Sequence, residues 1–346
     1  MTIESSIPAH LTAQRTVPAQ MPDGFTPPYP SFSARFDPTV ERVVMAYFGV
    51  QFRGDQQPAA VVEALVEIAA ATSAADGPAH WDRAQYVDEA GYTTIISILY
   101  WLDAAAWQRW REQVPSWTSP DRYTPHAGFF TEIVSPGMSR FETLFSSDRT
   151  EGVSVPSTGL SGEVSEHAYW GGARDRLPIA QADELAPSGA TTLVREGKLV
   201  RVIPHENICL IRSGQEWTET EGDERRMYLE DVEPVLRAGM DFIRDDGRSI
   251  GCFANRYVRV LDDEGGLTDK SFGLSWWRSL ADLEVWSKSH PTHIAIFGAA
   301  MNYLSTMGPA AKLRLYHEIT VATADQVEFE YLGCHDQTGM LRIHES

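Results

Sequence analysis

The feature that most restricts the fold of this chain is an internal repeat. Two pairs of tryptophans share a spacing of nine residues, and two pairs of glutamates share a spacing of ten residues. These pairs are Trp101 with Trp110, Trp277 with Trp286, Glu132 with Glu142, and Glu318 with Glu328. In each half of the chain the tryptophans come first. Two matched spacings in the same order predict that the chain consists of two related halves.

The local patterns predict the same order of elements in both halves. Runs rich in β-branched and aromatic residues indicate strands, and apolar residues at helical spacing indicate helices. In the first half we expect strands at 43–52, 93–101, 129–134 and 141–145 and helices at 58–72 and 104–110. In the second half we expect strands at 207–213, 271–277, 313–321 and 327–332 and helices at 223–243, interrupted near Pro234, and at 280–286.

This order predicts an α+β fold made of duplicated ferredoxin-like halves, each with an antiparallel sheet and helices on one face. The halves are expected at residues 39–190 and 191–346. Two such sheets packed face to face form an α+β barrel of the dimeric type, with a pocket between sheet and helices. Residues 1–38 contain seven prolines. We expect them to form an extended arm, because proline disrupts helix and sheet interiors. The arm would lie on the body or on a partner subunit.

Composition excludes several classes of function. The formal net charge of -19 disfavours nucleic acids and anionic membranes as partners. No apolar run is long enough to span a bilayer, and the N-terminus lacks a signal-peptide pattern. Three widely spaced cysteines favour a reducing cytoplasm over a disulfide framework. The chain has no C-x-x-C-H sequence for covalent attachment of haem, so any haem would be held non-covalently.

Several segments resemble the haem-containing aldoxime dehydratases, a family that includes phenylacetaldoxime and aliphatic aldoxime dehydratases. They include RFETLF (140–145), EHAYWGGARDRLPI (166–179), LIRSGQEW (210–217), HPTHIAIF (290–297) and KLRLYHE (312–318). The resemblance extends over nearly everything from residue 25 onward. It implies a duplicated α+β barrel, a b-type haem that is ferrous in the active state, and a homodimer. It also implies a lyase that removes water from an aldoxime, R–CH=N–OH, to leave a nitrile, with the substrate nitrogen bound to the haem iron.

The resemblance also implies a role for five residues. His293 would be the axial ligand of the haem iron, and Ser213 would hold the oxime hydroxyl. His317 would be the distal acid and base, Arg176 would belong to the distal network, and Glu142 would support the histidine.

The residues themselves leave alternatives open for the iron ligand. Pro291 suits the first position of a helix. That helix would place Phe297, Ala300, Met301 and Leu304 on the same face as His293, which suits a flat apolar porphyrin with an axial nitrogen. An ordinary buried histidine gives the same pattern. The pair His290 and His293 could instead begin a zinc site, although no third ligand stands at a useful spacing.

His317 alternates with Leu313, Leu315 and Ile319 on a predicted strand, so we expect it to share their face and to point into the barrel. Loss of water from an aldoxime needs an acid at the oxygen and a base at the C–H group. One histidine can serve as both near neutral pH. The alternative is a structural histidine, and His126 and His167 are interpreted in that way.

Ser213 ends an apolar strand before Gly214, where a hydroxyl can face a pocket, but a turn serine is the alternative. Arg176 and Glu142 are either surface charges or buried partners, because a buried charge must be paired. Arg174 competes with Arg176 for the same role. Two other functions also remain open. One is a haem peroxidase or an enzyme like chlorite dismutase, and the other is a haem-binding protein without catalytic activity.

Overall fold

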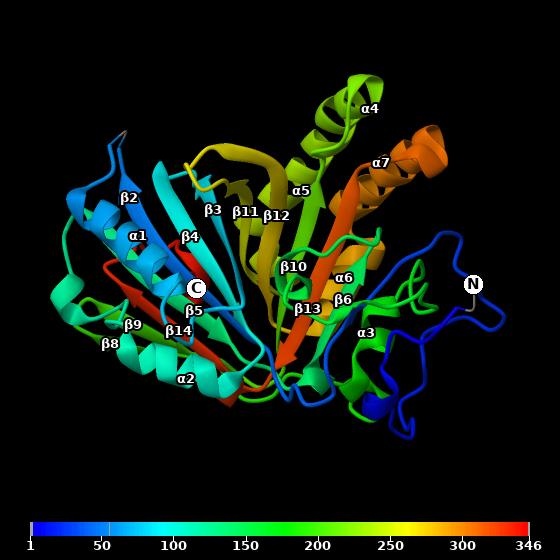
Figure 1. Ribbon diagram of the computed structural model, residues 1–346, viewed down its shortest axis with the longest axis horizontal. Coiled ribbons are helices and arrows are strands. Elements are labelled where there is room, and N and C mark those ends of the chain that lie inside the picture. Colours follow the sequence, from blue (N-terminus) through cyan, green and yellow to red (C-terminus); the bar gives the residue numbers. More distant parts are fainter. Residues whose placement is uncertain (1–2, 55, 345–346) are drawn as a thin grey trace.

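The computed structural model describes residues 3–54 and 56–344. It shows an α+β fold built on a curled antiparallel sheet of twelve strands (Figure 1). The strands follow one another across the sheet in the order β6-β13-β10-β12-β11-β3-β4-β2-β5-β14-β9-β8. The short strands β1 (Ala34–Arg35) and β7 (Gly159–Leu160) form a separate pair. The expected α+β class and the antiparallel sheet are therefore confirmed.

The first half of the chain supplies four adjacent strands and two helices. Its elements are β2 (Val44–Arg53), α1 (Ala59–Thr72), β3 (His80–Val87), β4 (Tyr92–Trp101), α2 (Ala104–Gln113) and β5 (Ala127–Val134). Across the sheet these strands lie in the order β3-β4-β2-β5. The predicted strands and helices of this half are confirmed, but β3 was not predicted.

The second half repeats this arrangement. Its elements are β10 (Ile208–Glu216), α4 (Gly222–Met227), the π-helical turn η6 (Tyr228–Val232), α5 (Glu233–Asp245), β11 (Cys252–Leu261), β12 (Leu267–Trp277), α6 (Leu280–Ser289), α7 (Pro291–Met307) and β13 (Arg314–Ala322). Across the sheet its strands lie in the order β11-β12-β10-β13. Here β11 was not predicted. The expected interruption of the long helix is the turn η6, which ends just before Pro234 in the first turn of α5.

The two halves are joined at one strand pair, and each contributes a strand to the other. Strand β11 pairs with β3, which makes the sheet continuous. Strand β6 (Phe141–Phe145) follows β5 in sequence but pairs with β13, whereas β14 (Val327–Leu332) follows β13 and pairs with β5. Strands β8 (Thr192–Glu196) and β9 (Leu199–Ile203) extend the sheet beyond β14.

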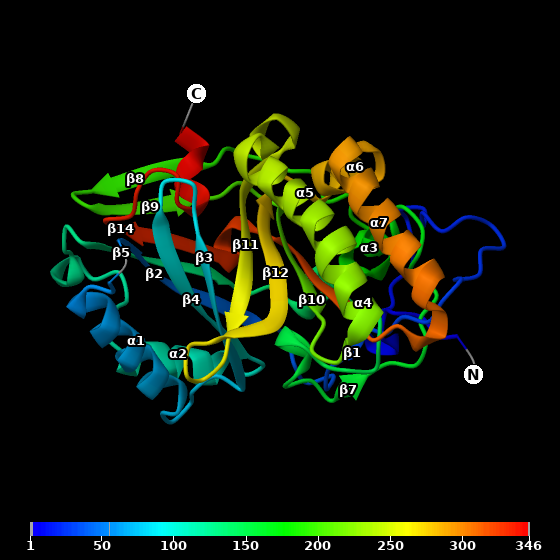
Figure 2. The same cartoon turned by 90° about the horizontal axis from the view of Figure 1, so that it is seen from above.

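The sheet has an inner and an outer face with separate cores. On the inner face the two halves meet, and the ring centroids of Trp276 and Phe329 lie 4.7 Å apart. On the outer face α1 and α2 cover the first half, and α5, α6 and α7 cover the second half (Figure 2). None of the helices within the described residues is both long and apolar enough to cross a membrane.

The N-terminal arm lies on the body of its own chain, beside the short helix α3 (Gly172–Arg176) (Figure 1). The backbone N–H groups of Thr16 and Val17 donate to the carbonyl oxygen of Gln181 at 2.8 and 3.1 Å. Of the two expected locations, the structure therefore shows the first, a contact with the body.

Candidate active site

Three of the predicted site residues lie on neighbouring strands of the second half. Ser213 on β10 is directly opposite His317 on β13, and Glu142 on β6 is opposite Ile319, two residues further along β13. Residues opposite each other in an antiparallel pair share a face, and so do residues two apart on one strand. The side chains of Ser213, His317 and Glu142 therefore all point to the same side of the sheet.

That side is the outer face, so the prediction that His317 points into the barrel is wrong. Its neighbours Ile319 and Val321 pack in the apolar cluster beneath α5 and α6, whereas Ala322 packs in the inner core. The alternation along the strand was predicted correctly. The assignment of its faces failed because both faces of this strand are buried, so burial alone does not distinguish them.

Arg176, the last residue of α3, completes the cluster. Its Nε and Nη2 donate to the two carboxylate oxygens of Glu142 at 2.6 and 3.2 Å, and its Nη1 donates to the carbonyl oxygen of Glu166 at 2.6 Å. Both Glu142 and Arg176 are buried. Burial acts to raise the pKa of the Glu142 carboxyl, but Arg176 and His317 outweigh it, so the pKa is lowered. Glu142 is therefore a carboxylate at neutral pH.

One nitrogen of His317 contacts both members of this ion pair. Its Nε2 lies 2.7 Å from Nη2 of Arg176 and 3.0 Å from Oε1 of Glu142. Arginine can only donate and a carboxylate can only accept. A proton on Nε2 is therefore stabilised by Glu142, and when that proton leaves, the free lone pair accepts from Arg176. Both protonation states of this nitrogen have a partner in place, as a group acting first as acid and then as base requires.

Ser213 is half-buried, and its hydroxyl makes no hydrogen bond with any of the described residues. The apolar clusters of this face end on either side of it. Ile211 belongs to the cluster beneath α5 and α6, and Leu315 belongs to a second cluster around Trp217 and Tyr303. Neither cluster includes Ser213 or His317. A hydroxyl and an imidazole thus interrupt an otherwise apolar face.

Arg174, the competing residue, does not join the cluster. Its guanidinium pairs with Glu284 at 2.7 Å and donates to the carbonyl oxygen of Glu184 at 2.9 Å. The two arginines would share a face only if their segment were extended. Because α3 is helical, residues two apart point in nearly opposite directions. Arg176 is therefore the arginine that contacts His317.

His293 lies in the first turn of α7, where a helical residue was expected. Its ring lies against the rings of Trp286 and Trp170, with centroids 4.7 and 6.0 Å away. Burial lowers the pKa of His293 to about 4, although the backbone of Ser287 acts in the opposite direction. Its Nδ1 makes no hydrogen bond of ordinary geometry with the described residues. Burial thus favours the neutral form of the His293 imidazole, and its buried Nδ1 is left without a partner among the described residues.

His290 has a different environment. It caps the N-terminus of α7, because its Nδ1 accepts from the backbone N–H of Thr292, and its ring stacks on Phe242 with centroids 4.4 Å apart. Within the described part of the chain, no cluster of three or more histidine, cysteine or acidic side chains could hold a metal ion. His293 and His290 therefore do not form part of such a cluster.

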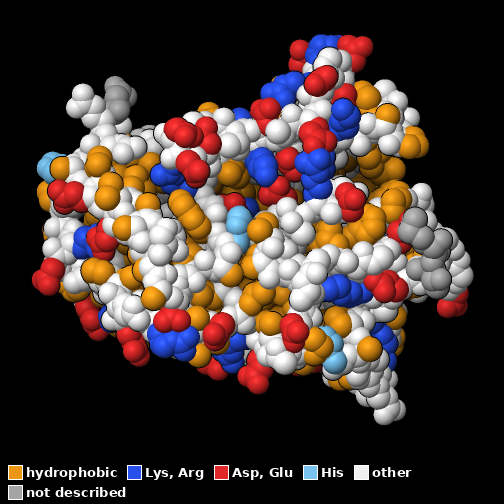
Figure 3. Space-filling model, in the orientation of Figure 1, with side chains coloured by type: hydrophobic (Ala, Val, Ile, Leu, Met, Phe, Trp, Pro, Cys, Tyr) orange, Lys and Arg blue, Asp and Glu red, His pale blue; other side chains and the backbone are white. Residues whose placement is uncertain are grey.

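Helix α7 exposes apolar side chains close to His293. Ile294, Phe297 and Met301 are 51, 46 and 36% exposed, and Trp170, which packs against Phe297, is 42% exposed. Figure 3 shows apolar side chains gathered around the position of α7, on a face where acidic and basic groups are otherwise spread widely. A contiguous apolar surface of this kind indicates a binding site. Trp170 was not predicted from the sequence as part of a site, because a lone tryptophan in a loop carries no pattern.

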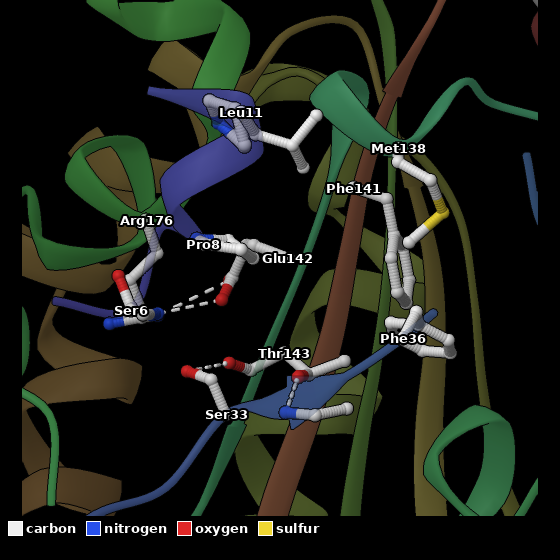
Figure 4. A pocket seen from close by; sticks show the side chains of 12 residues that line it. Ser6, Pro8, Leu11, Ser33, Phe36, Met138, Phe141, Glu142, Thr143 and Arg176 are labelled. Carbon is white, nitrogen blue, oxygen red and sulfur yellow. Dashed lines mark hydrogen bonds and ion pairs between the residues drawn. The ribbon is translucent and has the colours of Figure 1, made fainter. Parts of the chain in front are cut away.

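A cavity of about 40 Å³ lies behind the ion pair of Arg176 and Glu142 (Figure 4). The arm residues Ser6, Pro8 and Leu11 form one wall of it, and the ion pair forms part of another. The arm therefore lies close to the ion pair of Arg176 and Glu142. The sequence did not predict this contribution of the arm.

Comparison with known proteins relates this geometry to an activity. A family model described as haem-containing dehydratase matches residues 46–340. An aliphatic aldoxime dehydratase of Rhodococcus globerulus is 44% identical over alignments that cover 98% of both chains. A phenylacetaldoxime dehydratase of Bacillus sp. (strain OxB-1) is 32% identical, with 94% of both chains covered.

Solved structures agree with these relatives. A crystal structure of an aldoxime dehydratase in complex with butyraldoxime has a TM-score of 0.93 at 43% identity, covering 98% of this chain and 96% of that chain. A second crystal structure of an aldoxime dehydratase has a TM-score of 0.92 at 42% identity, covering 98% of both chains. The structural similarity thus extends over nearly the whole chain.

Proposed function

The chain belongs to the family of haem-containing dehydratases and catalyses the dehydration of aldoximes to nitriles, and from this premise we propose that His293, His317, Ser213, Arg176 and Glu142 form its active site. The enzyme is a lyase with haem as its cofactor. The observation that carries the assignment of residues is the position of the His317 Nε2, between Arg176 and Glu142 and opposite Ser213.

The residues near α7 fit a haem group. An axial ligand must be a neutral imidazole, and the low pKa of His293, about 4, provides one at neutral pH. A porphyrin needs an apolar surface, and the exposed side chains Ile294, Phe297 and Met301 supply it on the same helix. These residues would hold a haem group, with the His293 imidazole as the ligand of its iron and the apolar side chains of α7 as contacts for the porphyrin.

Ferrous haem, when bound, supplies an electron-rich iron that can ligate the oxime nitrogen and weaken the N–O bond. The protein residues handle the protons and the orientation of the substrate. The free hydroxyl of Ser213 donates a hydrogen bond to the oxime oxygen and so fixes the direction of the N–O bond. Arg176 and Glu142 hold the His317 ring in place from the side.

His317 carries out the proton transfers in sequence. Protonated His317 passes one proton to the oxime oxygen and becomes neutral, the N–O bond breaks and water leaves. The neutral imidazole, stabilised by Arg176 at 2.7 Å, then takes the C–H proton as the nitrile triple bond forms. The histidine returns to its initial state, and no electron is consumed overall.

We propose further that the chain is a duplication of two ferredoxin-like units, at 39–190 and 191–346. The shared element order and the mirrored strand orders support this division, as does the reciprocal exchange of β6 and β14. The arm, 1–38, belongs to neither unit. The first two and last two residues of the chain lie outside the described residues.

The substrate, the assembly and the compartment are proposed as well. We propose aliphatic aldoximes as preferred substrates, because the relatives named as aliphatic enzymes are 41 to 44% identical and the phenylacetaldoxime enzyme is 32% identical. A homodimer follows from the family resemblance. Three free cysteines, Cys209, Cys252 and Cys334, support a reducing cytoplasm.

The haem-loaded enzyme, reduced under anaerobic conditions, tests this proposal directly. It should convert aldoximes to nitriles without peroxide, with short aliphatic aldoximes favoured over phenylacetaldoxime. His293→Ala should lose haem during gel filtration, and His290→Ala, the matched control, should retain it. Retention of haem with an unchanged spectrum in His293→Ala would place the iron ligand elsewhere.

A further inference from the structure

The N-terminal arm is connected to Arg176 through a single residue. Glu166 accepts two hydrogen bonds from the arm at its carboxylate. The hydroxyl of Ser5 donates to Oε1 and the backbone N–H of Ser6 donates to Oε2, both at 2.8 Å. The carbonyl oxygen of the same residue accepts from Nη1 of Arg176 at 2.6 Å. Residues far apart in sequence thus meet at the guanidinium.

A second carboxylate attaches the arm to the helix that carries Arg176. Asp175 is 1% exposed, and its carboxylate accepts from the backbone N–H groups of Gln20 and Met21 at 2.8 and 3.0 Å. The hydroxyl of Tyr169 also donates to it, at 2.8 Å. A buried carboxylate is stable only with such partners. Because the arm supplies two of these donors, the position of α3 depends on the arm.

The arm also limits the space around the ion pair. Ser6 and Pro8 line the small cavity behind Arg176 and Glu142 (Figure 4). Ser6 therefore has two roles: its N–H group donates to Glu166, and the residue lines the same small cavity as Arg176. The hydroxyl of Ser6 is buried and makes no hydrogen bond with the described residues.

We propose that Glu166 is a positioning residue for the dehydration, through which the arm fixes the guanidinium of Arg176 against Glu142 and His317. The proposal rests on the function assigned to Arg176 above. The Nε and Nη2 atoms of Arg176 are used by Glu142 and His317, so Nη1 on Glu166 is the remaining anchor. Without a firm anchor, the guanidinium shifts relative to the His317 Nε2. Misplacement by about 1 Å at a reacting centre costs up to about 10²-fold in rate.

Glu166→Ala in the full-length, haem-loaded enzyme tests the proposal. It releases Ser5 and Ser6 and loosens the backbone whose carbonyl holds Arg176. We expect kcat/KM to fall by about 10- to 100-fold, mainly through kcat, with haem content unchanged. Glu163→Gln is the matched control, because Glu163 lies in the same segment and its carboxylate makes no hydrogen bond with the described residues. It should leave both constants unchanged.

A double-mutant cycle separates positioning from a merely structural role. If Glu166 acts through Arg176, Glu166→Ala should cost less than about threefold in an Arg176→Lys background. Equal losses in both backgrounds would overturn the proposal. If Glu166→Ala folds poorly, Glu166→Gln replaces it in the same cycle, because glutamine keeps the size and one acceptor oxygen. The expected loss of kcat/KM is then smaller. Equal losses in the two backgrounds would again overturn the proposal.

A readout independent of activity distinguishes failure of this proposal from failure of the proposed function. The Nε–H group of Arg176, bonded to Glu142, can be observed by NMR in arginine-labelled enzyme and assigned by its absence in Arg176→Lys. The ferrous enzyme with carbon monoxide bound is diamagnetic and suits this measurement.

Glu166→Ala should make the hydrogen exchange of this proton with water faster, and Glu163→Gln should not. An unchanged exchange rate would overturn the positioning role. If exchange becomes faster while Arg176→Lys keeps full activity, the arm positions Arg176 and the catalytic assignment of Arg176 is wrong.

Discussion

The outer faces of the two halves have the same strand topology but carry different kinds of side chains. Beneath α1 and α2, the first half presents Phe48, Val50 and Trp101 in a continuous apolar core that includes Trp107 and Trp110 of α2. Beneath α5 to α7, the second half presents Ser213, His317 and Glu142 between two separate apolar clusters. One face stabilises the fold, and the other leaves polar groups and exposed apolar side chains for a ligand.

Strand register makes the comparison residue by residue. Phe48 on β2 lies opposite Ser97 and Thr131, just as Ser213 on β10 lies opposite Gly273 and His317. Similarly, Glu328 lies opposite Ile133, just as Glu142 lies opposite Ile319. Phe48, Thr131 and Glu328 are therefore the counterparts of Ser213, His317 and Glu142. A large aromatic residue in the core of one half corresponds to a small hydroxyl in the site of the other.

The largest expected effect is at His317. In His317→Ala the chemical step should fall by about 10²- to 10⁴-fold, because a positioned acid–base group is lost and this one acts twice. The reduced protein should retain haem and show the same aldoxime-induced spectral change as the wild type. Thr131→Ala, its counterpart in the other half, should keep its activity. Loss of haem in His317→Ala would identify this residue as the iron ligand and reverse the two assignments.

Ser213→Ala should reduce kcat by about 10²- to 10³-fold, the usual cost of removing one positioned donor to a developing charge. Because the hydroxyl of Ser213 makes no hydrogen bond in the fold, the free energy of unfolding should change little. Steady-state kinetics and denaturant titration of the same sample test both statements. Full activity in this variant would remove Ser213 from the site.

Phe48→Ala should show the opposite pattern. Phe48 is 7% exposed and packs edge-on against Trp110 and Trp117, with ring centroids 5.8 and 5.7 Å apart. Truncation should therefore lower the free energy of unfolding by about 3–5 kcal/mol. The folded fraction should keep nearly normal kcat, since the residue is remote from His317. A decrease in the free energy of unfolding of less than about 1 kcal/mol would show that this apolar face does not stabilise the fold in the way proposed here.

The paired glutamates should differ in stability. Glu142 is buried against Arg176, so Glu142→Gln leaves a buried cation without its counterion and should cost about 3 kcal/mol, together with activity. Glu328 makes a surface ion pair with Arg111 at 2.7 Å, and Glu328→Gln should cost about 0–1 kcal/mol. Thermal unfolding of the two variants provides the measurement. Equal losses would argue against different roles for these counterparts.

The sequence predicted one side of this comparison better than the other. Runs of β-branched and aromatic residues predicted β2 and β4, in which most side chains on both faces are hydrocarbon or aromatic. These runs did not reveal β3 and β11, because charged and polar residues interrupt the apolar pattern in both strands. Asp82 on β3 pairs with Arg212 at 2.9 Å, and Arg256 on β11 donates to Glu132 at 2.8 Å. From the sequence alone, a charged residue is expected to be exposed, because burial requires a partner of opposite charge. In both of these pairs the partner lies in the other half of the chain, so the local sequence does not reveal it.

The same reasoning explains what could be predicted of the site. The five residues were assigned by resemblance to a family, since no local pattern brings Glu142, Arg176 and His317 together. Local rules predicted that any buried charge would be paired, and Arg176 with Glu142 agrees with that rule. They did not predict Glu166, whose contribution to Arg176 is a backbone carbonyl that any residue type could supply.

The smallest expected effect concerns pH and His167. This residue is buried near the arm without a hydrogen-bond partner in the described part of the chain. Burial, followed by the nearby charge of Arg176, lowers the pKa of His167 to about 4. Between about pH 6.5 and 4 the unfolded chain binds a proton there that the folded chain does not bind. Stability contributed by His167 is therefore present above this window and is lost as pH falls through it.

His167→Gln removes this titration and preserves a polar side chain of similar size. The difference in free energy of unfolding between wild type and variant should change by about 1 kcal/mol between pH 7 and pH 4, to the disadvantage of the wild type at low pH. The expected value is small because His167 borders a cavity and is not packed on all sides. Urea titrations at several pH values measure it. By contrast, Phe48→Ala should differ from the wild type by the same amount throughout this range, since Phe48 does not titrate. A pH-independent difference for His167→Gln would mean that its imidazole finds a partner or solvent in the folded state.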